Sequence, residues 1–283
     1  MQEGDRSGLV LGGGGITGVG WELGLLAGLA EASVDLLSAD LIVGTSAGSV
    51  VGAQITSGTP IEALYQRQME PPSNELLARV GPREKLGYLA AFVRSRGDLA
   101  KFGRKIGAMS LKAAGAGRVP GVEQRLAVIG SRLPSTEWPE RDLRVTVVDA
   151  RSGEFRVITR LERVPLVDAV AASCAVPGVY PPIPIGDRTY IDGGFRSSTN
   201  ADVAEGCTKI VVLAPLSRGV GAIKGPRQQL NELGASSIVV APDSASRAAI
   251  GGNVLDPAAR RGAAQAGRAQ AAVVLEQVRA VWS

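Results

Sequence analysis

The sequence predicts a three-layer α/β/α fold, in which helices cover both faces of a mostly parallel central β-sheet. Short runs rich in Val, Ile and Leu alternate with segments whose apolar residues recur at helical spacing, which is typical of such a sheet. The composition, 45% apolar and 20% charged, is that of a globular protein and excludes a disordered or coiled-coil chain. A chain of 283 residues can bury one large core, so we expect a single domain over residues 1–283.

Two units of strand, glycine-rich turn and helix open the chain. In each unit a short apolar run stops at a cluster of glycines, and a segment with helical spacing follows. The strand, turn and helix of the two units are expected at residues 8–11, 12–15 and 18–32, and at residues 40–43, 44–48 and 49–56. Both helices therefore begin just beyond a turn that ends a strand.

The second half of the chain supplies the remaining strands. Runs rich in β-branched residues predict them at residues 143–148, 155–159, 189–191, 210–214 and 238–241. The clearest late helix is expected over residues 257–281, because Pro257 occupies a first-turn position directly after Asp256. Helices that alternate with parallel strands cover both faces of their sheet.

The stretch from residue 60 to residue 134 contains no convincing strand, so we expect a helical cap or insertion there. Between Arg79 and Arg118 it has ten Lys and Arg residues and two acids, a net charge of +8, and the whole-chain +4 leaves −4 for the rest. Apolar residues share this segment: Leu86, Leu89, Ala90, Phe92 and Val93. The combination is typical of a helix at a membrane surface, so we expect peripheral contact of Arg79 to Arg118 with an anionic membrane. A solvated helical face whose apolar side packs on the core is the alternative.

The sequence contains no histidine, which excludes a Ser-His-Asp triad and any histidine metal ligand. Cys174 and Cys207 are too few for a disulfide framework and lie among apolar residues, which indicates buried thiols. We expect no metal, organic cofactor or nucleic acid to bind. The first eight residues do not resemble a secretory signal, and the longest apolar stretch, Leu41 to Ile55, is too short to span a bilayer. These features predict a cytoplasmic protein that contacts the inner membrane face only peripherally, if at all.

A candidate nucleophile lies in the second glycine-rich turn. Residues 44–48 read Gly-Thr-Ser-Ala-Gly, which fits the G-x-S-x-G pattern of a sharp strand-to-helix turn that exposes a serine hydroxyl. Gly44 and Gly48 remove Cβ atoms that would clash in such a turn. The predicted strand before Ser46 and the predicted helix after it provide the context that this pattern requires.

A serine hydroxyl needs a base, and without histidine only a carboxylate, a lysine or a water molecule is available. Asp192 is the candidate, because Asp192-Gly193-Gly194 follows a predicted strand and a short loop there could aim the carboxylate at Ser46. Burial would raise its basicity above that of an ordinary aspartate. A plain Asp-Gly turn without a catalytic role is the alternative.

The first glycine-rich turn predicts an anion site. Gly13, Gly14 and Gly15 would present backbone N–H groups beside the start of a helix near Gly18, which suits an oxyanion or a phosphate. A dinucleotide site is the alternative, because residues 13–18 fit G-x-G-x-x-G, and Asp35 or Asp40 could then bind the ribose. The serine turn immediately downstream favours the oxyanion.

These three motifs, in this order, resemble the patatin-like phospholipase family, whose members combine a glycine-rich oxyanion loop, G-x-S-x-G and Asp-Gly-Gly or Asp-Gly-Ala. The resemblance covers residues 8–58 and 143–215, including the segment Ala172 to Gly178 before the aspartate, and is poor over the basic insertion. The sequence departs from the family at one point. The family's glycine loop usually ends in a small residue, Arg or Lys, and Gly, whereas here Thr17 occupies the position of the cation.

The resemblance implies a patatin-like fold and a lipid acyl hydrolase of phospholipase A or carboxylesterase type, with a lipid or fatty-acyl ester as substrate. It implies Ser46 as nucleophile, Asp192 as base, and an oxyanion hole formed by Gly13, Gly14 and Gly15. The glycines that support these motifs are Gly18, Gly44, Gly48, Gly193 and Gly194. Two alternatives stay open at this stage: a non-catalytic lipid-binding or nucleotide-binding protein of the same fold, and an acyltransferase that uses the same dyad.

Overall fold

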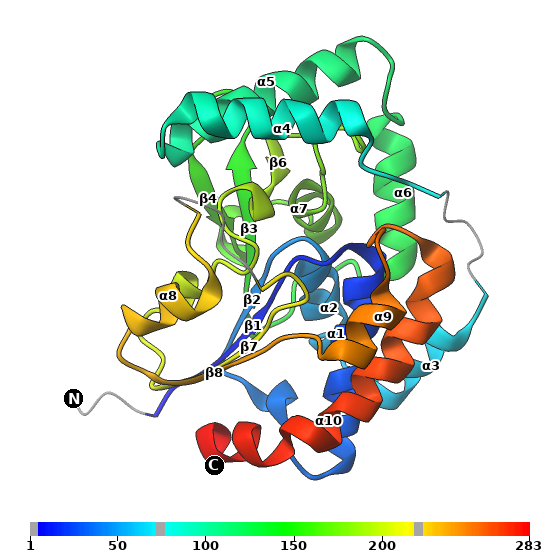
Figure 1. Ribbon diagram of the computed structural model, residues 1–283, viewed down its shortest axis with the longest axis vertical. Helices are drawn as coiled ribbons and strands as arrows, with labels where there is room; N and C mark the ends of the chain where they lie inside the picture. The colour runs from blue at the N-terminus through cyan, green and yellow to red at the C-terminus, as the bar shows by residue number, and fades with distance from the viewer. Residues whose placement is uncertain (1–4, 72–76, 218–222) are drawn as a thin grey trace.

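Eight strands of the computed structural model form one sheet, and helices cover both of its faces (Figure 1). The structure describes residues 5–71, 77–217 and 223–283. Within these residues the strand order is β5-β6-β3-β2-β1-β7-β8, and β4 pairs with β3. The strands are β1 (Ser7–Leu11), β2 (Leu41–Gly44), β3 (Asp142–Asp149), β4 (Phe155–Ile158), β5 (Ile183–Ile185), β6 (Arg188–Asp192), β7 (Lys209–Leu213) and β8 (Ser236–Val240).

Parallel and antiparallel pairings occupy different parts of the sheet. Strands β3, β2, β1, β7 and β8 pair in parallel, whereas β4, β6 and β5 are joined by antiparallel pairings. Every residue of β1 and β2 is buried, which is why both strands are continuous apolar runs in the sequence. The predicted α/β/α class with a mostly parallel sheet is confirmed.

The side chains of β1 divide between the two faces of the sheet. Leu9 and Leu11 belong to the core beneath the larger helical layer, whereas Val10 belongs to a second core on the opposite face. The larger layer contains α1 (Gly15–Glu31), α2 (Ala47–Ile55), α7 (Leu166–Ser173), α9 (Ser244–Ile250) and α10 (Arg260–Trp282). The opposite face is covered by α8 (Pro226–Asn231) and a short 3₁₀ helix at Ala201–Ala204, so the two layers lie on either side of the sheet (Figure 1).

Glycines bring α1 and α10 into close contact. A Cβ atom added to Gly24 would lie 2.0 Å from the carbonyl oxygen of Ala264, and one added to Gly267 would lie 2.3 Å from the carbonyl oxygen of Trp21. No side chain fits at such distances, so the two backbones approach because both helices lack side chains at the contact. This packing anchors α1, whose first turn forms part of the site described below.

The described residues between 60 and 134 are helical but do not form one continuous cap over the sheet. They contain α3 (Ile61–Met69), α4 (Pro82–Ser95), α5 (Leu99–Gly115) and α6 (Val122–Arg132). Helix α3 packs against α1 and α10, and α6 packs against α7. Helices α4 and α5 cover the antiparallel end of the sheet instead, where Phe102 and Ile106 pack with Val148 and Ile191. In the described part of the chain, no helix is both long enough and apolar enough to cross a bilayer.

Candidate active site

Ser46 lies in the sharp turn between β2 and α2. Its φ of 53° and ψ of −115° are strained for a residue with a side chain, which is typical of a serine on a strand-to-helix turn. The turn needs its glycines, because a Cβ on Gly48 would lie 2.0 Å from the carbonyl oxygen of Leu11, and one on Gly44 would lie 2.5 Å from the Cα of Ser49. The turn therefore holds Ser46 in a conformation that a flexible loop would not keep.

Asp192 ends β6 and is buried. Its Oδ1 accepts a hydrogen bond of 2.7 Å from the N–H of Gly194. Burial raises the pKa of Asp192 to about 6, while hydrogen bonds from the Ser46 side chain and the Gly194 N–H, and the charge of Arg125, lower it. The structure thus brings the two residues proposed as nucleophile and base into contact, and it makes the carboxylate a stronger base than an exposed aspartate.

The topology of β3 explains why these two residues meet. Strand β4 pairs with Val145 to Val148 along one edge of β3, so β2 and β6 must share the other edge, one after the other. Gly44 at the end of β2 pairs with Val145, and Asp192 at the end of β6 pairs with Val147. Because β2 is parallel to β3 and β6 is antiparallel to it, the carboxyl ends of both strands point at each other.

A buried polar network fixes the serine turn and the aspartate turn relative to each other, and Asn200 is its centre. The Asn200 Nδ2 lies 3.1 Å from Thr45 Oγ1, 3.2 Å from Thr146 Oγ1 and 3.3 Å from the carbonyl oxygen of Gly193. Thr45 precedes Ser46 and Gly193 follows Asp192, so one amide group connects the serine turn to the aspartate turn. No local pattern in the sequence predicts this role of Asn200, because its partners come from three separate segments of the chain.

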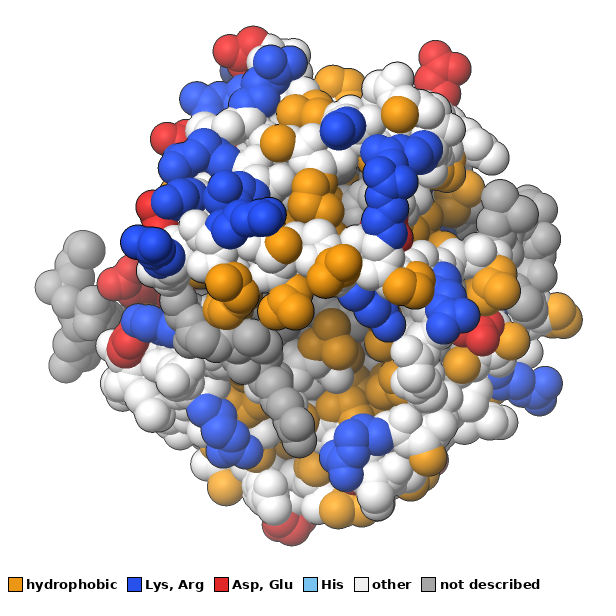
Figure 2. All heavy atoms as spheres, turned by 45° about the horizontal axis from the view of Figure 1, so that its top comes forward, with side chains coloured by type: hydrophobic (Ala, Val, Ile, Leu, Met, Phe, Trp, Pro, Cys, Tyr) orange, Lys and Arg blue, Asp and Glu red, His pale blue; other side chains and the backbone are white. Residues whose placement is uncertain are grey.

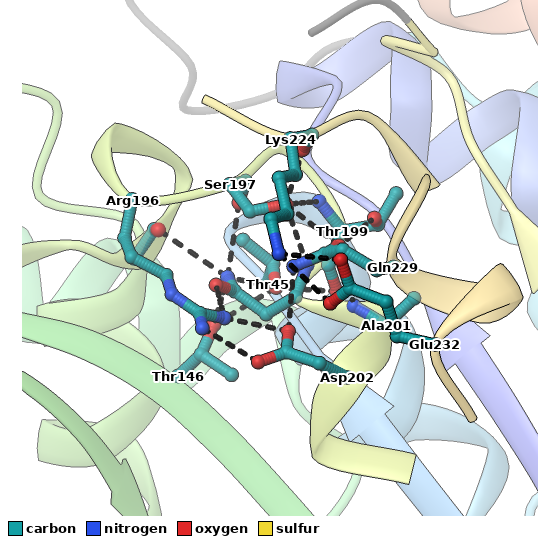
Figure 3. A network of polar contacts seen from close by, with 12 residues as sticks. Thr45, Thr146, Arg196, Ser197, Thr199, Ala201, Asp202, Lys224, Gln229 and Glu232 are labelled. Carbon is teal, nitrogen blue, oxygen red and sulfur yellow. Dashed lines mark hydrogen bonds and ion pairs between the residues drawn. The ribbon is translucent and has the colours of Figure 1, made fainter. Parts of the chain in front are cut away.

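The network continues outward from the aspartate turn, as Figure 3 shows. Gln229 accepts hydrogen bonds from the Ser197 hydroxyl and the Ala201 N–H, and its own amide donates to Asp202 at 2.6 Å. Asp202 in turn forms an ion pair of 2.5 Å with Arg196. The segment after Asp192 is therefore held by side chains of α8 and the 3₁₀ helix beside it.

The glycine-rich loop contributes fewer free N–H groups than the sequence predicts. The N–H of Gly13 donates a 2.7 Å hydrogen bond to the carbonyl oxygen of Ser198, so it is not available to an oxyanion, which corrects the expectation for this residue. The N–H groups of Gly14 and Gly15 donate to no atom of the described residues. The N–H of Ala47, at the start of α2, likewise has no acceptor among the described residues, although the sequence predicts only the glycines as donors.

Gly12 and Thr17 show how the loop is held. The N–H of Gly12 donates to the carbonyl oxygen of Leu213 at 2.9 Å and to Glu22 Oε1 at 2.8 Å. The hydroxyl of Thr17, at the position of the family's usual cation, is buried and lies 3.3 Å from the carbonyl oxygen of Val254. Thr17 therefore serves in attaching the loop to the chain near residue 254, and it supplies no charge.

The dinucleotide alternative is wrong. Asp40 precedes β2 and accepts hydrogen bonds from Ser7 at the start of β1, whereas the glycine-rich loop follows the end of β1. Asp35 caps a 3₁₀ turn earlier still in the chain. A ribose-binding acid must lie at the same end of the strands as the loop. In the described residues, no group of three or more His, Cys, Asp and Glu side chains could hold a metal ion.

A cavity of about 420 Å³ opens beside Ser46. Its lining is mainly apolar and comes from α1, α2, α6 and the segments near residues 176 and 255. Its larger aliphatic side chains are Ile16, Val19, Val50, Val128, Val176 and Leu255. Arg125 of α6 also lines it and stacks on Tyr180 with its guanidinium 3.6 Å from the ring centre. Gly15, Ser46 and Ala47 also line this cavity. The size and lining suit an acyl chain.

The fold and the site define a class: an α/β/α protein whose serine and buried carboxylate meet at the edge of an apolar cavity. The family model described as Patatin-like phospholipase matches residues 9–205. The chain belongs to this family, which confirms the resemblance seen in its motifs and supports a lipid hydrolase.

Solved structures that are similar to the chain include VipD and ExoU. VipD from Legionella pneumophila has 13% sequence identity and a TM-score of 0.48, and the similarity covers 96% of this chain and 67% of VipD. The type III effector protein ExoU has 17% identity and a TM-score of 0.42, with 97% of this chain and 53% of ExoU covered. The chain thus spans about two thirds of VipD and about half of ExoU. No curated protein sequence matches it.

Proposed function

We propose that the protein hydrolyses lipid acyl esters, as a phospholipase A or a carboxylesterase, with a Ser46–Asp192 dyad. One observation carries this proposal: Ser46 lies close enough to the buried Asp192 carboxylate to lower its pKa, which burial nevertheless raises to about 6, and both residues lie at the edge of an apolar cavity. A base with a pKa close to neutrality can take a proton and return it within one reaction. No histidine is present in the chain to do this instead.

In the first half of the reaction, the Ser46 hydroxyl oxygen attacks the acyl carbonyl carbon while Asp192 accepts the hydroxyl proton. The carbonyl π-bond breaks, and its electron pair forms the oxyanion of a tetrahedral intermediate. The N–H groups of Gly14, Gly15 and Ala47 are the candidates to stabilise it, because none is used by the described residues around them. When the intermediate collapses, the ester C–O bond breaks and Asp192 returns its proton to the leaving alcohol.

In the second half, water hydrolyses the acyl-enzyme ester on Ser46. Asp192 accepts a proton from the water as its oxygen attacks the acyl carbon, and it then gives that proton back to the Ser46 oxygen as the acid leaves. Each half-reaction therefore starts and ends with Asp192 ionised. The cavity beside Ser46 would hold the acyl chain, since its lining is mainly apolar.

A fluorophosphonate serine probe tests this proposal directly. We expect it to label the wild-type protein and not the Ser46→Ala variant, whereas Ser131→Ala, which removes an exposed serine on α6, should label like the wild type. A folded protein that neither reacts with the probe nor hydrolyses any ester would contradict the proposal and favour a binding protein. Labelling of Ser46 together with transfer of the acyl group to an alcohol in preference to water would show an acyltransferase.

A further inference from the structure

Helix α4 presents large apolar side chains to solvent. Leu86, Leu89 and Val93 are 68%, 59% and 64% exposed. Their spacing of three and four residues places them on one side of the helix. Leu77, shortly before the helix, is 71% exposed as well. Six large apolar side chains among the described residues are at least 59% exposed, and four of them lie within this one stretch of 17 residues.

Leu86, Leu89 and Val93 do not lie on the side of α4 that faces the core. That side is formed by Tyr88, Ala91 and Phe92, which pack with Phe102 of α5 and with Phe195. The helix is therefore apolar on two sides, although a helix that only covers a core needs one. A row of exposed apolar side chains of this kind marks a surface that contacts something else.

The same surface is strongly basic. Ten cations lie on and beside α4 and α5: Arg79, Arg83, Lys85, Arg94, Arg96, Lys101, Arg104, Lys105, Lys112 and Arg118. Within the described parts of the chain, none of them forms an ion pair. Figure 2 looks onto this side of the molecule and shows a row of hydrophobic side chains with Lys and Arg gathered beside it, above a hollow in the surface.

Helix α4 is also in contact with the walls of the candidate active site. The Tyr88 hydroxyl donates a hydrogen bond to the carbonyl oxygen of Pro177, next to Val176, which lines the cavity beside Ser46. The Tyr88 ring meets Phe195, three residues after Asp192, edge-on at 5.0 Å. The outward apolar row and the catalytic turns therefore lie on opposite sides of the same helix.

We propose that the outer face of α4, together with the cations of α4 and α5, docks on the surface of an anionic lipid bilayer. The three apolar side chains would enter the interface, and the Lys and Arg side chains would contact lipid phosphates. A second copy of the chain is a poor occupant, because two surfaces of net charge +8 would repel each other. This role serves the proposed function, since it places the active site at a lipid surface, but binding itself needs no catalysis.

The experiment measures co-sedimentation of the Ser46→Ala protein with vesicles of phosphatidylcholine alone or enriched in phosphatidylserine. We expect stronger binding to the anionic vesicles and weaker binding when salt rises from about 0.1 M to about 1 M, which shortens the Debye length from about 10 Å to about 3 Å. Each Lys or Arg near an anionic surface contributes roughly fivefold to affinity, so reversing three should reduce binding by on the order of 100-fold. The three reversals are Lys85→Glu, Arg94→Glu and Lys101→Glu.

A second variant tests the apolar row, with Leu86, Leu89 and Val93 each changed to Gln. We expect its vesicle binding to fall by on the order of tenfold, because less apolar surface enters the interface. Matched controls change exposed residues elsewhere: Leu161→Gln with Val273→Gln for the apolar row, and Arg160→Glu with Arg163→Glu for the charges. The controls should bind as the parent protein does. In the Ser46-intact protein, all variants should hydrolyse a short soluble ester at the parent rate.

Three results would overturn this proposal. The first is unchanged vesicle binding in both α4 variants. The second is binding that is equal on neutral and anionic vesicles and insensitive to salt. The third is a parent protein that self-associates through this face, with the Gln variant becoming monomeric and neither protein binding vesicles. Failure of the proposed hydrolase would look different, because vesicle binding would persist while the serine probe failed to label Ser46.

Discussion

Residues 7–55 and residues 77–118 differ in how much of their surface is buried. In the first region, β1, β2 and the whole of α2 are buried, and a Cβ added to several of its glycines, such as Gly24, Gly44 and Gly48, would clash with backbone atoms. In the second, α4 buries only Ala91 and Ser95 and exposes both leucines and cations. The first region holds the glycine-rich loop and Ser46 in one geometry, whereas the second exposes apolar and basic side chains to solvent. A substitution in the first should therefore act on chemistry or folding, and one in the second on where the protein binds.

The largest effect is expected from the dyad. Ser46→Ala and Asp192→Asn should each reduce hydrolysis by on the order of 10⁴-fold or more, and the double variant should be little worse, because the proposed mechanism uses both residues as one proton-transfer unit. Vesicle binding through α4 should not change in any of the three. The measurement is the rate of ester hydrolysis at saturating substrate, with circular dichroism as the control for folding. Losses that add in the double variant would show that Asp192 is not the partner of Ser46.

The next largest effect is expected on stability. In Gly48→Ala the new Cβ would lie 2.0 Å from the carbonyl oxygen of Leu11, so β1 or α2 must move, and we expect a loss of about 3 kcal/mol or more. The matched variant is Gly115→Ala at the end of α5, where nothing lies within 4 Å of the added atom. Gly115→Ala should make the protein slightly more stable, by less than about 1 kcal/mol. Urea unfolding followed by circular dichroism distinguishes the two, and equal midpoints would contradict the contrast between the regions.

The sequence predicted the first region well, because its signals are local. A strand, a glycine-rich turn and a helix succeed one another twice, and the structure places β1, α1, β2 and α2 at these positions within a few residues. Ser46 follows from such a pattern, since the turn geometry depends on Gly44 and Gly48 a few residues away. Asp192 was found as a carboxylate at the end of a predicted strand, although its contact with Ser46 depends on the order of strands along β3.

The features that the sequence did not predict depend on contacts between distant segments. Strand β5 contains Pro184, which argues against a strand, and it exists through its pairing with β6 at an edge of the sheet. Asn200 joins Thr45 to Thr146, and the N–H of Gly13 is used by Ser198; neither contact has a local signal. In the second region the sequence grouped Phe92 with Leu89 and Val93, whereas the structure turns Phe92 inward.

The pH dependence of the two regions should differ. Asp192 must be ionised to accept a proton, and its pKa is about 6, so hydrolysis of a soluble ester should rise about tenfold per pH unit below 6 and level off above it. Vesicle binding should stay constant between pH 5.5 and pH 8, because Lys and Arg remain charged over this range. Rates and binding are measured on the same samples, with circular dichroism to establish that the protein stays folded. A rate that does not change between pH 5 and pH 7 would exclude Asp192 as the base.

The last prediction concerns Glu22, a carboxyl group that the proposed mechanism does not use. Glu22 is fully buried in α1, and its Oε1 accepts the N–H of Gly12 at 2.8 Å. Its Oε2 has no hydrogen-bond partner in the described part of the chain. Burial raises the pKa of Glu22 well above its ordinary value of 4.5. Glu22 therefore keeps its proton, or takes one up, when the protein folds.

A folded-state pKa above the unfolded value stabilises the protein fully below the unfolded pKa, and this contribution is lost as pH rises toward the folded pKa. Wild-type stability should therefore fall above about pH 4.5 relative to Glu22→Gln, by about 1.4 kcal/mol per pH unit, because one proton is taken up on folding. Urea unfolding at pH 5, 6 and 7 measures this difference, and Glu205→Gln, at an exposed position, is the control that should follow the wild type. If the Glu22→Gln curve also runs parallel to the wild type, Glu22 is ionised in the folded protein, and the loop at Gly12 is then held by a charge. Parallel stability curves would also weaken the contrast between the two regions, because residues 7–55 would then bury an ionised group, whereas residues 77–118 keep their charged groups at the surface.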